Sequence, residues 1–178
     1  GKAIAQAIGT DYFTLLELVP KRGVDLEIQD TVYIGKGKRD QIYKVLGKLD
    51  YENLTATSRI ELEYSIREIV NNNEEKFVDF FNTAGAISTR LHKLELIPGI
   101  GKKYMWEIVE ARKEKPFESF EDITTRIPSL NNPAEMIVNR VKQELDTTTA
   151  KKGKKKYYLF TPIPKTQKKH RNNRNQRK

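Results

Sequence analysis

Short stretches rich in apolar residues dominate the first part of the chain. Three such stretches occupy residues 13–19, 31–34 and 42–49, and segments rich in glycine, proline and aspartate separate them. Short apolar stretches bounded by residues that favour turns predict β-strands, and residues 31–34 also alternate between apolar and polar positions. Three strands so close together in sequence predict a small twisted sheet or a barrel-like domain over residues 12–55.

The pattern changes to helical spacing after residue 55. Four apolar residues recur at positions i, i+4, i+7 and i+8, namely Leu62, Ile66, Ile69 and Val70. This spacing places them on one face of a helix, which Thr55 or Thr57 can cap. A second helix is predicted over residues 74–84, and Gly85 ends it. Residues 56–85 are therefore predicted to be connecting helices.

Residues 86–146 have the pattern of an all-α unit. Helical spacing predicts four segments within it, at residues 89–96, 102–113, 119–126 and 133–145. The last segment has the clearest start. Asn132 suits the N-cap, Pro133 suits the first helical position, and Glu135 completes a capping-box pattern. The whole chain is thus expected to be an α+β protein.

The chain carries its excess positive charge at one end. Of 33 Lys and Arg residues among 178, 12 lie in residues 151–178, which contain no acid. Residues 1–150 hold the other 21 and all 24 Asp and Glu, a net charge of −3, although the whole chain has +9. Residues 147–178 form a basic tail that indicates a polyanionic partner and is expected to be disordered without one. Within it, the apolar residues 157–160 can return to pair with the N-terminal sheet.

Composition excludes several classes of chemistry. The chain has no cysteine, so it has no disulfide scaffold, no thiol nucleophile and no cysteine-ligated zinc. No apolar run approaches the roughly 18–20 residues of a membrane-spanning helix, and no signal peptide is evident. His92 and His170 lack partners at metal-ligand spacing. We expect a cytoplasmic protein that has no catalytic residues and uses no metal, cofactor or membrane.

One motif carries a specific chemical hypothesis. Residues 96–103, Leu-Ile-Pro-Gly-Ile-Gly-Lys-Lys, lie between two predicted helices and resemble the hairpin of helix-hairpin-helix proteins, which bind nucleic acids. Two glycines let the backbone turn tightly and approach a ligand, and the N-terminus of the following helix attracts an anion. The candidate phosphate contacts are Pro98, Gly99, Ile100, Gly101, Lys102 and Lys103. A tight turn without a ligand and a protein–protein contact are the alternatives.

Weaker candidates lie elsewhere in the chain. Residues 127–131 repeat the hairpin pattern without its glycines and lysines, so a structural role is expected there, with a weak phosphate contact at Asn131 or Asn132 as the alternative. A glycine-rich loop at residues 35–40 lacks the spacing of a nucleotide-hydrolysing phosphate loop. Its Lys36, Lys38 and Arg39 are either a second contact with the nucleic-acid backbone or solvated charges of a turn. Further phosphate contacts are expected from the tail, at Lys154, Lys155, Lys156, Lys168, Lys169, Arg171 and Arg174.

Three aromatic residues could either contact a ligand or pack within the protein. Tyr33 and Tyr43 lie on predicted strands, where tyrosines pack against neighbours more often than they stack on bases. Trp106 falls off the apolar stripe of its predicted helix. We expect it to pack between domains rather than to lie at a binding face.

Several segments together resemble a single family. Residues 13–19, 31–40, 74–82, 90–103, 116–123 and 157–160 are similar, in that order, to an uncharacterised archaeal family of proteins expected to bind RNA. The resemblance implies an N-terminal barrel like the oligonucleotide/oligosaccharide-binding (OB) fold, followed by tandem helix-hairpin-helix units.

The favoured hypothesis is a non-catalytic protein that binds structured RNA, such as that of a ribosome or another ribonucleoprotein particle. The acid-free tail, in which Lys, Arg, Asn and Gln are interleaved, resembles the extensions of ribosomal proteins and favours RNA over DNA. The hairpin does not distinguish the two, because phosphate contacts do not report on the sugar. A DNA-binding accessory factor in repair or recombination and a protein-interaction adaptor are the alternatives.

Overall fold

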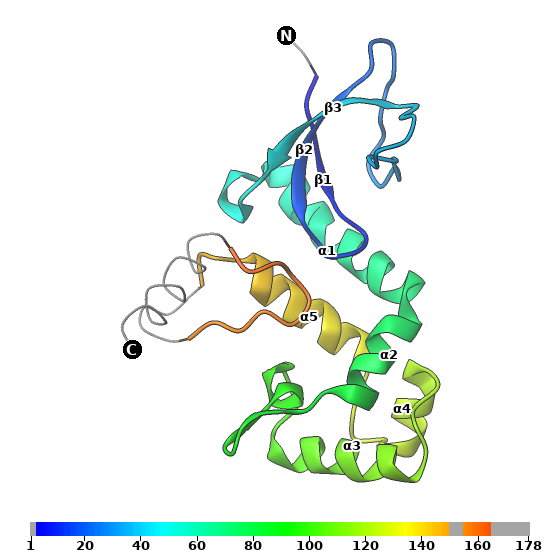
Figure 1. Cartoon of the computed structure of the whole chain (residues 1–178), viewed down its shortest axis with the longest axis vertical. Helices are drawn as coiled ribbons and strands as arrows, with labels where there is room; N and C mark the ends of the chain where they lie inside the picture. The colour runs from blue at the N-terminus through cyan, green and yellow to red at the C-terminus, as the bar shows by residue number, and fades with distance from the viewer. Residues whose placement is uncertain (1–2, 150–154, 165–178) are drawn as a thin grey trace.

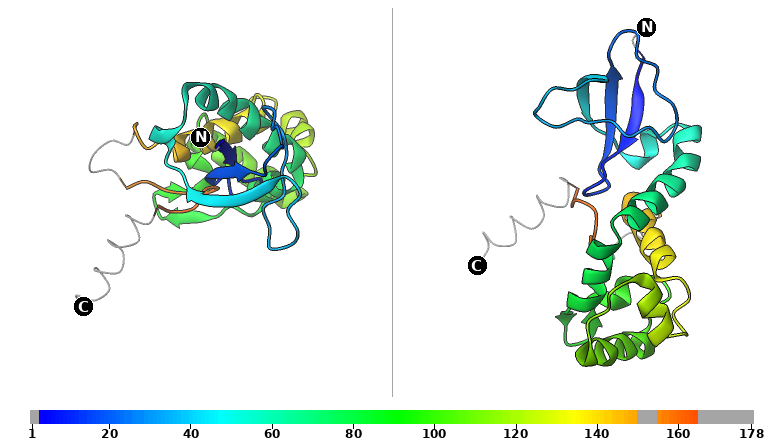
Figure 2. Two further views of the ribbon diagram at one scale, coloured as in Figure 1. Left: turned by 90° about the horizontal axis from the view of Figure 1, so that it is seen from above. Right: turned by 90° about the vertical axis from the view of Figure 1, so that its right-hand side faces the viewer.

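The molecule is elongated, with a small sheet at one end and a group of helices at the other (Figure 1). The computed structural model describes residues 3–149 and 155–164. A long helix connects the two ends, and the C-terminal segment lies alongside their junction (Figures 1 and 2). Within the described residues, two small antiparallel sheets and five α-helices form an α+β protein, as the sequence predicts.

Three antiparallel strands form the N-terminal sheet, with β2 in the centre. They are β1 (Ala5–Ile8), β2 (Leu15–Pro20) and β3 (Ile42–Lys48). Leu18 of β2 lies opposite Ala5 on one side and Val45 on the other. The side chains of Leu15, Leu18 and Ile42 are buried, but only Leu15 belongs to the core that the sheet shares with the helices. Burial along β2 does not alternate strictly, and its pairing with β3 is irregular between Glu17 and Leu18.

Three predictions for this sheet are wrong. Strand β1 lies before residue 12, outside the predicted domain. The sequence did not reveal it, because Ala5 and Ala7 show no clear alternation and this short strand depends on its pairing with β2. Residues 31–34 form no strand, since they lie in the long loop between β2 and β3, where no described strand pairs with their backbone. Among the described residues the sheet has three strands and does not close into the predicted barrel.

Helix α1 (Ala56–Asn72) follows a short 3-10 turn, η1 (Tyr51–Asn53), and connects the sheet to the other helices (Figure 1). Thr55 is its N-cap and accepts a hydrogen bond from the Ser58 N–H at 3.1 Å. The predicted apolar face is buried, at Leu62, Ile66, Ile69 and Val70. Helix α2 (Glu74–Thr83) follows after Asn73 and buries Phe77, Val78 and Phe81. Both helices lie where the periodicity predicts them.

The remaining elements form the helical unit. They are β4 (Ala86–Ser88), β5 (Leu91–His92), the 3-10 turn η2 (Lys93–Leu96), α3 (Lys102–Glu114), α4 (Phe120–Arg126) and α5 (Pro133–Leu145). The three predicted helices after residue 100 are confirmed, but the predicted helix at residues 89–96 is wrong.

In place of that helix, a β-hairpin leads into a single 3-10 turn. The Leu94 N–H donates to His92 Nδ1 at 3.1 Å, and the His92 N–H donates to the Glu95 carboxylate at 2.8 Å. Burial lowers the pKa of His92, which favours an unprotonated Nδ1 that can accept this bond. These local hydrogen bonds hold the turn, and Pro98 follows too closely for an α-helix to continue.

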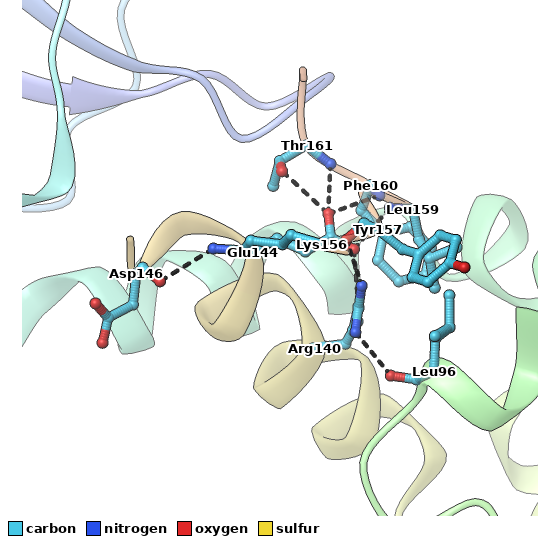
Figure 3. Close-up of polar contacts among 9 residues, drawn as sticks. All are labelled: Leu96, Arg140, Glu144, Asp146, Lys156, Tyr157, Leu159, Phe160 and Thr161. Carbon is cyan, nitrogen blue, oxygen red and sulfur yellow. Dashed lines mark hydrogen bonds and ion pairs between the residues drawn. The ribbon is translucent and has the colours of Figure 1, made fainter. Parts of the chain in front are cut away.

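The apolar segment at residues 157–160 does not pair with the N-terminal sheet, so that expectation is wrong. It runs beside α5 and is held by Glu144, whose side chain is 1% exposed (Figure 3). The Glu144 carboxylate accepts hydrogen bonds from the N–H groups of Leu159 (2.7 Å), Phe160 (3.0 Å) and Thr161 (2.9 Å), and from the Thr161 hydroxyl (3.0 Å). A side chain thus replaces a neighbouring strand as the partner of this backbone.

Arg140 completes this arrangement, one turn before Glu144 on α5. Its Nε lies 2.8 Å from the Glu144 carboxylate. Its two terminal nitrogens donate to the carbonyls of Leu96 (3.0 Å) and Tyr157 (2.6 Å) (Figure 3). We call Arg140, Glu144 and the backbone of residues 157–161 the C-terminal clasp. The clasp joins α5, the residue that ends η2 and the C-terminal segment through buried polar groups.

Aromatic packing extends this junction to the sheet. The ring centroid of Phe160 lies 5.0 Å from that of Phe80 and 5.5 Å from that of Phe77. Phe77 in turn lies 6.0 Å from Phe13, in the turn between β1 and β2. Phe13 is fully buried although its φ is +54°, a conformation that is uncommon for a bulky residue. The sheet, α2 and the C-terminal segment therefore share one core.

Candidate nucleic-acid interface

The predicted hairpin forms a tight turn between η2 and α3. The Ile100 N–H donates to the Ile97 carbonyl at 3.0 Å, and both isoleucine side chains are buried, which anchors the turn. Half-buried Pro98 lies within the turn. Gly99 has a φ of +90°, which residues with a side chain rarely adopt, and a Cβ there would lie 3.4 Å from the methyl group of Met136. The turn itself therefore requires Gly99.

Gly101 differs from Gly99, because nothing in the surrounding structure requires a glycine there. It is the N-cap of α3, with φ −87° and ψ −174°, which any residue adopts. A Cβ at this position would meet no described atom within 4 Å. No side chain caps this end of α3, so the N–H groups of its first turn remain for solvent or an anion. The missing side chain leaves the backbone open to close approach from outside.

Lys102 and Lys103 place two charges beside this helix end. Their side chains are 68% and 80% exposed. Lys102 lies 3.4 Å from Glu95, and Lys103 lies 3.9 Å from Glu107. The hydrogen bond from the His92 N–H, together with Lys102, lowers the pKa of Glu95 and keeps it ionised. Such exposed pairs are weak, so a polyanion can compete for both lysines.

Two basic residues that the sequence motif does not include lie near this turn. Lys102 Nζ donates to the carbonyl of Arg90 at 3.3 Å, which brings the tip of the β4–β5 hairpin beside the start of α3. Arg90 and Lys93 are both exposed. The prediction of a helix over residues 89–96 concealed this proximity. In the sequence, the position of Arg90 and Lys93 shortly before the glycine motif was the one indication that they could lie near the turn.

The second hairpin repeats the turn of the first but not its open helix end. The Leu130 N–H donates to the Ile127 carbonyl at 2.9 Å, and both side chains are buried, as in the first hairpin. Helix α5 starts after Asn132, one residue later than the sequence alignment of the two hairpins implies. The Asn132 side chain accepts the Glu135 N–H at 3.2 Å, and Pro133 has no N–H to offer. These features favour the structural role that the sequence suggests.

Only half of the predicted capping box at α5 carries over into a cap. Asn132 is the N-cap, but the Glu135 carboxylate pairs with Arg67 of α1 at 2.8 Å. Arg67 also lies 2.9 Å from Glu63. Hydrogen bonds from Arg67 lower the pKa of Glu135, and the two carboxylates raise the pKa of Arg67. This end of α5 is therefore a contact with α1, where Arg67 and Lys142 balance the charges of Glu135 and Glu63, so that this cluster has no net positive charge to attract a phosphate.

The glycine-rich loop of Lys36, Lys38 and Arg39 lies far from the first hairpin. It belongs to the sheet end of the molecule, whereas α3 lies at the opposite end in both side views (Figures 1 and 2). Lys36 and Lys38 are exposed, and Arg39 Nε donates to the Gly35 carbonyl at 3.0 Å. The structure does not bring these three residues together with Gly101 and its neighbours.

Most of the predicted tail contacts lie outside the described residues, namely Lys154, Lys168, Lys169, Arg171 and Arg174. Lys155 is exposed, with Nζ 5.0 Å from the centre of the Tyr157 ring. Lys156 is half-buried and donates to the Asp146 carbonyl at 3.1 Å (Figure 3). Burial lowers the pKa of Lys156. Lys156 is therefore part of an intramolecular contact, which makes it a poorer candidate for phosphate binding than the exposed Lys155.

The comparisons with known proteins place the chain in one family. Residues 1–162 match the family described as "Protein of unknown function (DUF655)". The chain belongs to the DUF655 family. The uncharacterized protein MJ0038 of Methanocaldococcus jannaschii is 48% identical over 157 residues, which cover 88% of this chain and 70% of that protein. The predicted membership of an uncharacterised archaeal family is confirmed, whereas RNA binding and the helix-hairpin-helix units stay predictions.

A solved structure shows the same fold in a second member of the family. The crystal structure of Af1531 from Archaeoglobus fulgidus superposes on this DUF655 protein with a TM-score of 0.80. The two chains are 46% identical, and the match covers 90% of this chain and 86% of the other. The arrangement of sheet, connecting helix and helical unit is therefore similar to that of a solved structure.

The aromatic residues of this DUF655 protein do not all lie where the sequence suggests. Trp106 is 57% exposed on α3, so the expected packing between domains is wrong. Tyr43 is exposed on β3, which corrects its expected packing in the sheet. Tyr33 is also exposed, but its hydroxyl accepts the Gly37 N–H at 3.2 Å, and its ring occupies the space that a side chain at residue 35 would need.

Two further features are absent from the residues that the structure describes. No group of three or more His, Asp or Glu side chains in this part of the chain is placed to hold a metal ion. No helix within residues 3–149 and 155–164 is both long and apolar enough to cross a membrane.

Proposed function

We propose that this DUF655 protein is a non-catalytic RNA-binding protein that holds a phosphate of the RNA backbone at residues 99–103. In this proposal the two hairpins are tandem helix-hairpin-helix units, of which the first binds and the second supports. The observation that carries the proposal is the open position of Gly101, which neither conformation nor packing explains. A glycine at such a point is what close approach of a ligand to the backbone requires.

The surroundings of Gly101 suit a phosphate. The start of α3 has N–H groups that no side chain of the described residues caps, and it carries the positive end of the helix dipole. Exposed Lys102 and Lys103 follow Gly101 directly, and Lys102 contacts the backbone of Arg90, which is also exposed. Contacts of this kind position a nucleic acid without selecting its sequence. Lys36, Lys38 and Arg39 at the far end of the molecule supply a second contact for a long ligand.

The preference for RNA rests on the basic tail rather than on the hairpin. Residues 165–178 contain seven Lys and Arg, interleaved with Asn and Gln, and no acid. This composition suits threading along the phosphates of a folded RNA, such as that of a ribosome or another ribonucleoprotein particle. We propose no hydrolytic or phosphoryl-transfer activity, because the sequence contains no Ser-His-Asp, metal-ligand or cofactor pattern. Competition between RNA and DNA of the same sequence and structure tests the choice of nucleic acid.

The test of the hairpin compares two glycine substitutions. Gly101→Ala is expected to weaken RNA binding by about tenfold, on the order of 1.4 kcal/mol, because the new methyl group holds the phosphate away from the backbone. Gly85→Ala is the matched control, since a Cβ at Gly85 also meets no described atom within 4 Å. It is expected to leave the affinity unchanged. The measurement is a filter-binding or anisotropy titration at fixed salt.

Folding of both variants is checked first by thermal unfolding. An alanine at an N-cap costs about 1 kcal/mol or less relative to glycine, so Gly101→Ala is expected to fold. Equal affinities of the wild type, Gly101→Ala and Gly85→Ala would remove the hairpin from the binding site. A wild type that binds neither RNA nor DNA at low salt would reject the proposed function as a whole.

A further inference from the structure

Trp106 is the one tryptophan of the chain, and it points away from the core. It is 57% exposed, whereas the buried residues of its helix are Met105 and Ile108. Within the described part of the chain, no aromatic ring stacks on the indole and no cation lies over it. Indole is the largest side chain available for burial, and exposed tryptophans are concentrated at binding sites. The interior of this protein offers no reason for a tryptophan at this position.

The position of Trp106 on α3 connects it to the hairpin. It follows Lys102 by four residues and Lys103 by three, so it lies about one turn further along the same face of the helix, roughly 4.5–6 Å along the axis. Lys113 lies on this face two turns further on. Glu110 shares the face and pairs with Lys113 at 2.7 Å. The exposed indole thus lies near three lysines, each within 4 Å of a carboxylate of Glu95, Glu107 or Glu110, and one turn beyond the open backbone of Gly101.

We propose that Trp106 stacks on an unpaired base of the strand whose phosphate is bound at Gly101, so that the ligand is single-stranded or looped-out nucleic acid. This inference rests on the proposed function and specifies its ligand. The faces of bases inside a duplex are already covered by their neighbours, whereas an unpaired base offers a face to an aromatic ring. Stacking of this kind tolerates any base, which agrees with a site that otherwise contacts only phosphate.

The exposed lysines of this face favour a nucleic acid over a protein as its occupant, because their ion pairs with Glu95, Glu107 and Glu110 are weak and a phosphate can replace the carboxylates. An apolar pocket on a partner protein would also accept an indole. The lysines at positions 102, 103 and 113, together with Arg90 on the adjacent hairpin, complement a polyanion more directly. The position of Trp106 also fits. A strand whose phosphate is bound at the start of α3 can run along this face, and Trp106 lies only one helical turn further on.

The first experiment uses Trp106 as its own reporter. Because the chain has one tryptophan, the indole fluorescence of the full-length protein comes from this residue alone. Titration with a single-stranded oligouridylate is expected to quench this fluorescence as binding saturates. Titration with a blunt-ended RNA duplex of the same length is expected to leave the emission nearly unchanged, even where anisotropy shows that the duplex binds.

The second experiment measures affinity in three variants. Trp106→Ala is expected to weaken binding of the single strand by about fivefold or more, with about twofold or less change for the duplex. Trp106→Phe retains a flat ring and is expected to recover part of the loss. Tyr64→Ala is the matched control, because Tyr64 is 59% exposed on α1, and its affinity for both ligands is expected to equal that of the wild type.

The outcomes separate this inference from the proposed function. If the wild type binds RNA and Gly101→Ala weakens binding, while Trp106→Ala has no effect and the emission does not change, the stacking role is rejected and the phosphate site stands. If Trp106→Ala weakens single strand and duplex equally, the residue supports the fold of the interface and the inference is again rejected. If the wild type binds no nucleic acid, both proposals fail together.

Discussion

Replacing Glu144 with alanine is expected to lower the free energy of unfolding by about 3–5 kcal/mol, which is the usual cost of breaking a buried ion pair from one side. The Glu144 side chain is 1% exposed, and that of its partner Arg140 is 11% exposed. The substitution would leave the guanidinium without its counter-ion and would also leave four hydrogen-bond donors of residues 159–161 without an acceptor. Chemical denaturation followed by circular dichroism measures the loss.

A surface ion pair provides the control for this prediction. Glu110 lies 2.7 Å from Lys113, but both side chains are more than 60% exposed. Glu110→Ala is therefore expected to change stability by about 1 kcal/mol or less. Glu144→Gln keeps the shape and one acceptor oxygen, and it is expected to fall between the two alanine variants. If Glu144→Ala and Glu110→Ala were equally stable, the clasp would contribute nothing to the fold.

Removing the chain after Pro164 is expected to flatten the salt dependence of RNA binding by about 2–3 units on a log–log plot. The truncation removes seven Lys and Arg residues but keeps residues 157–161, which the clasp holds. Each phosphate contact contributes about 0.7–0.9 to the slope through release of counterions, and the estimate assumes that roughly half of the seven charges engage. The truncated protein should bind more weakly at low salt and approach the wild type as the salt concentration rises.

A full-length variant in which the same seven residues are glutamine separates charge from length. It is expected to show the same slope as the truncated protein, because counterion release depends on charge. Binding titrations over a fourfold range of salt measure both slopes, and the gap between truncated protein and wild type should narrow by about thirtyfold over that range. A slope equal to that of the wild type in both variants would show that the tail takes no part in binding, and the preference for RNA would lose its basis.

Helices with local signals were predictable from the sequence. Helix α5 lies at Pro133–Leu145 as expected, because Asn132, Pro133 and the apolar stripe all act within the segment itself. The buried face of α1 follows from the spacing of four residues for the same reason. Strand β1 and the 3-10 turn η2 escaped prediction, since a short strand depends on its neighbour and η2 depends on the side chains of His92 and Glu95.

The segment at residues 157–160 is another case in which a long-range contact could not be predicted from the sequence. Its four apolar residues correctly indicated a return to the body of the protein, but they did not indicate to which surface. The acceptor of its backbone is Glu144, and nothing in the sequence distinguishes this glutamate from the exposed ones around it. Its burial depends on the packing of α5 against Phe160 and the end of η2.

By itself, the sequence determined the glycine turn before α3, the two lysines that follow it, the helices with strong caps and the separation of a basic tail from a near-neutral body. These depend on the backbone freedom of single residues, on contacts within about four positions and on simple charge counts. Only the tertiary structure decided that Gly101 is open, that Trp106 is exposed beside it, that Asn132 and Pro133 close the second hairpin, and that Glu144 holds the C-terminal segment. These features depend on contacts between residues far apart in the sequence, and the local pattern of one segment does not specify which distant residues it contacts.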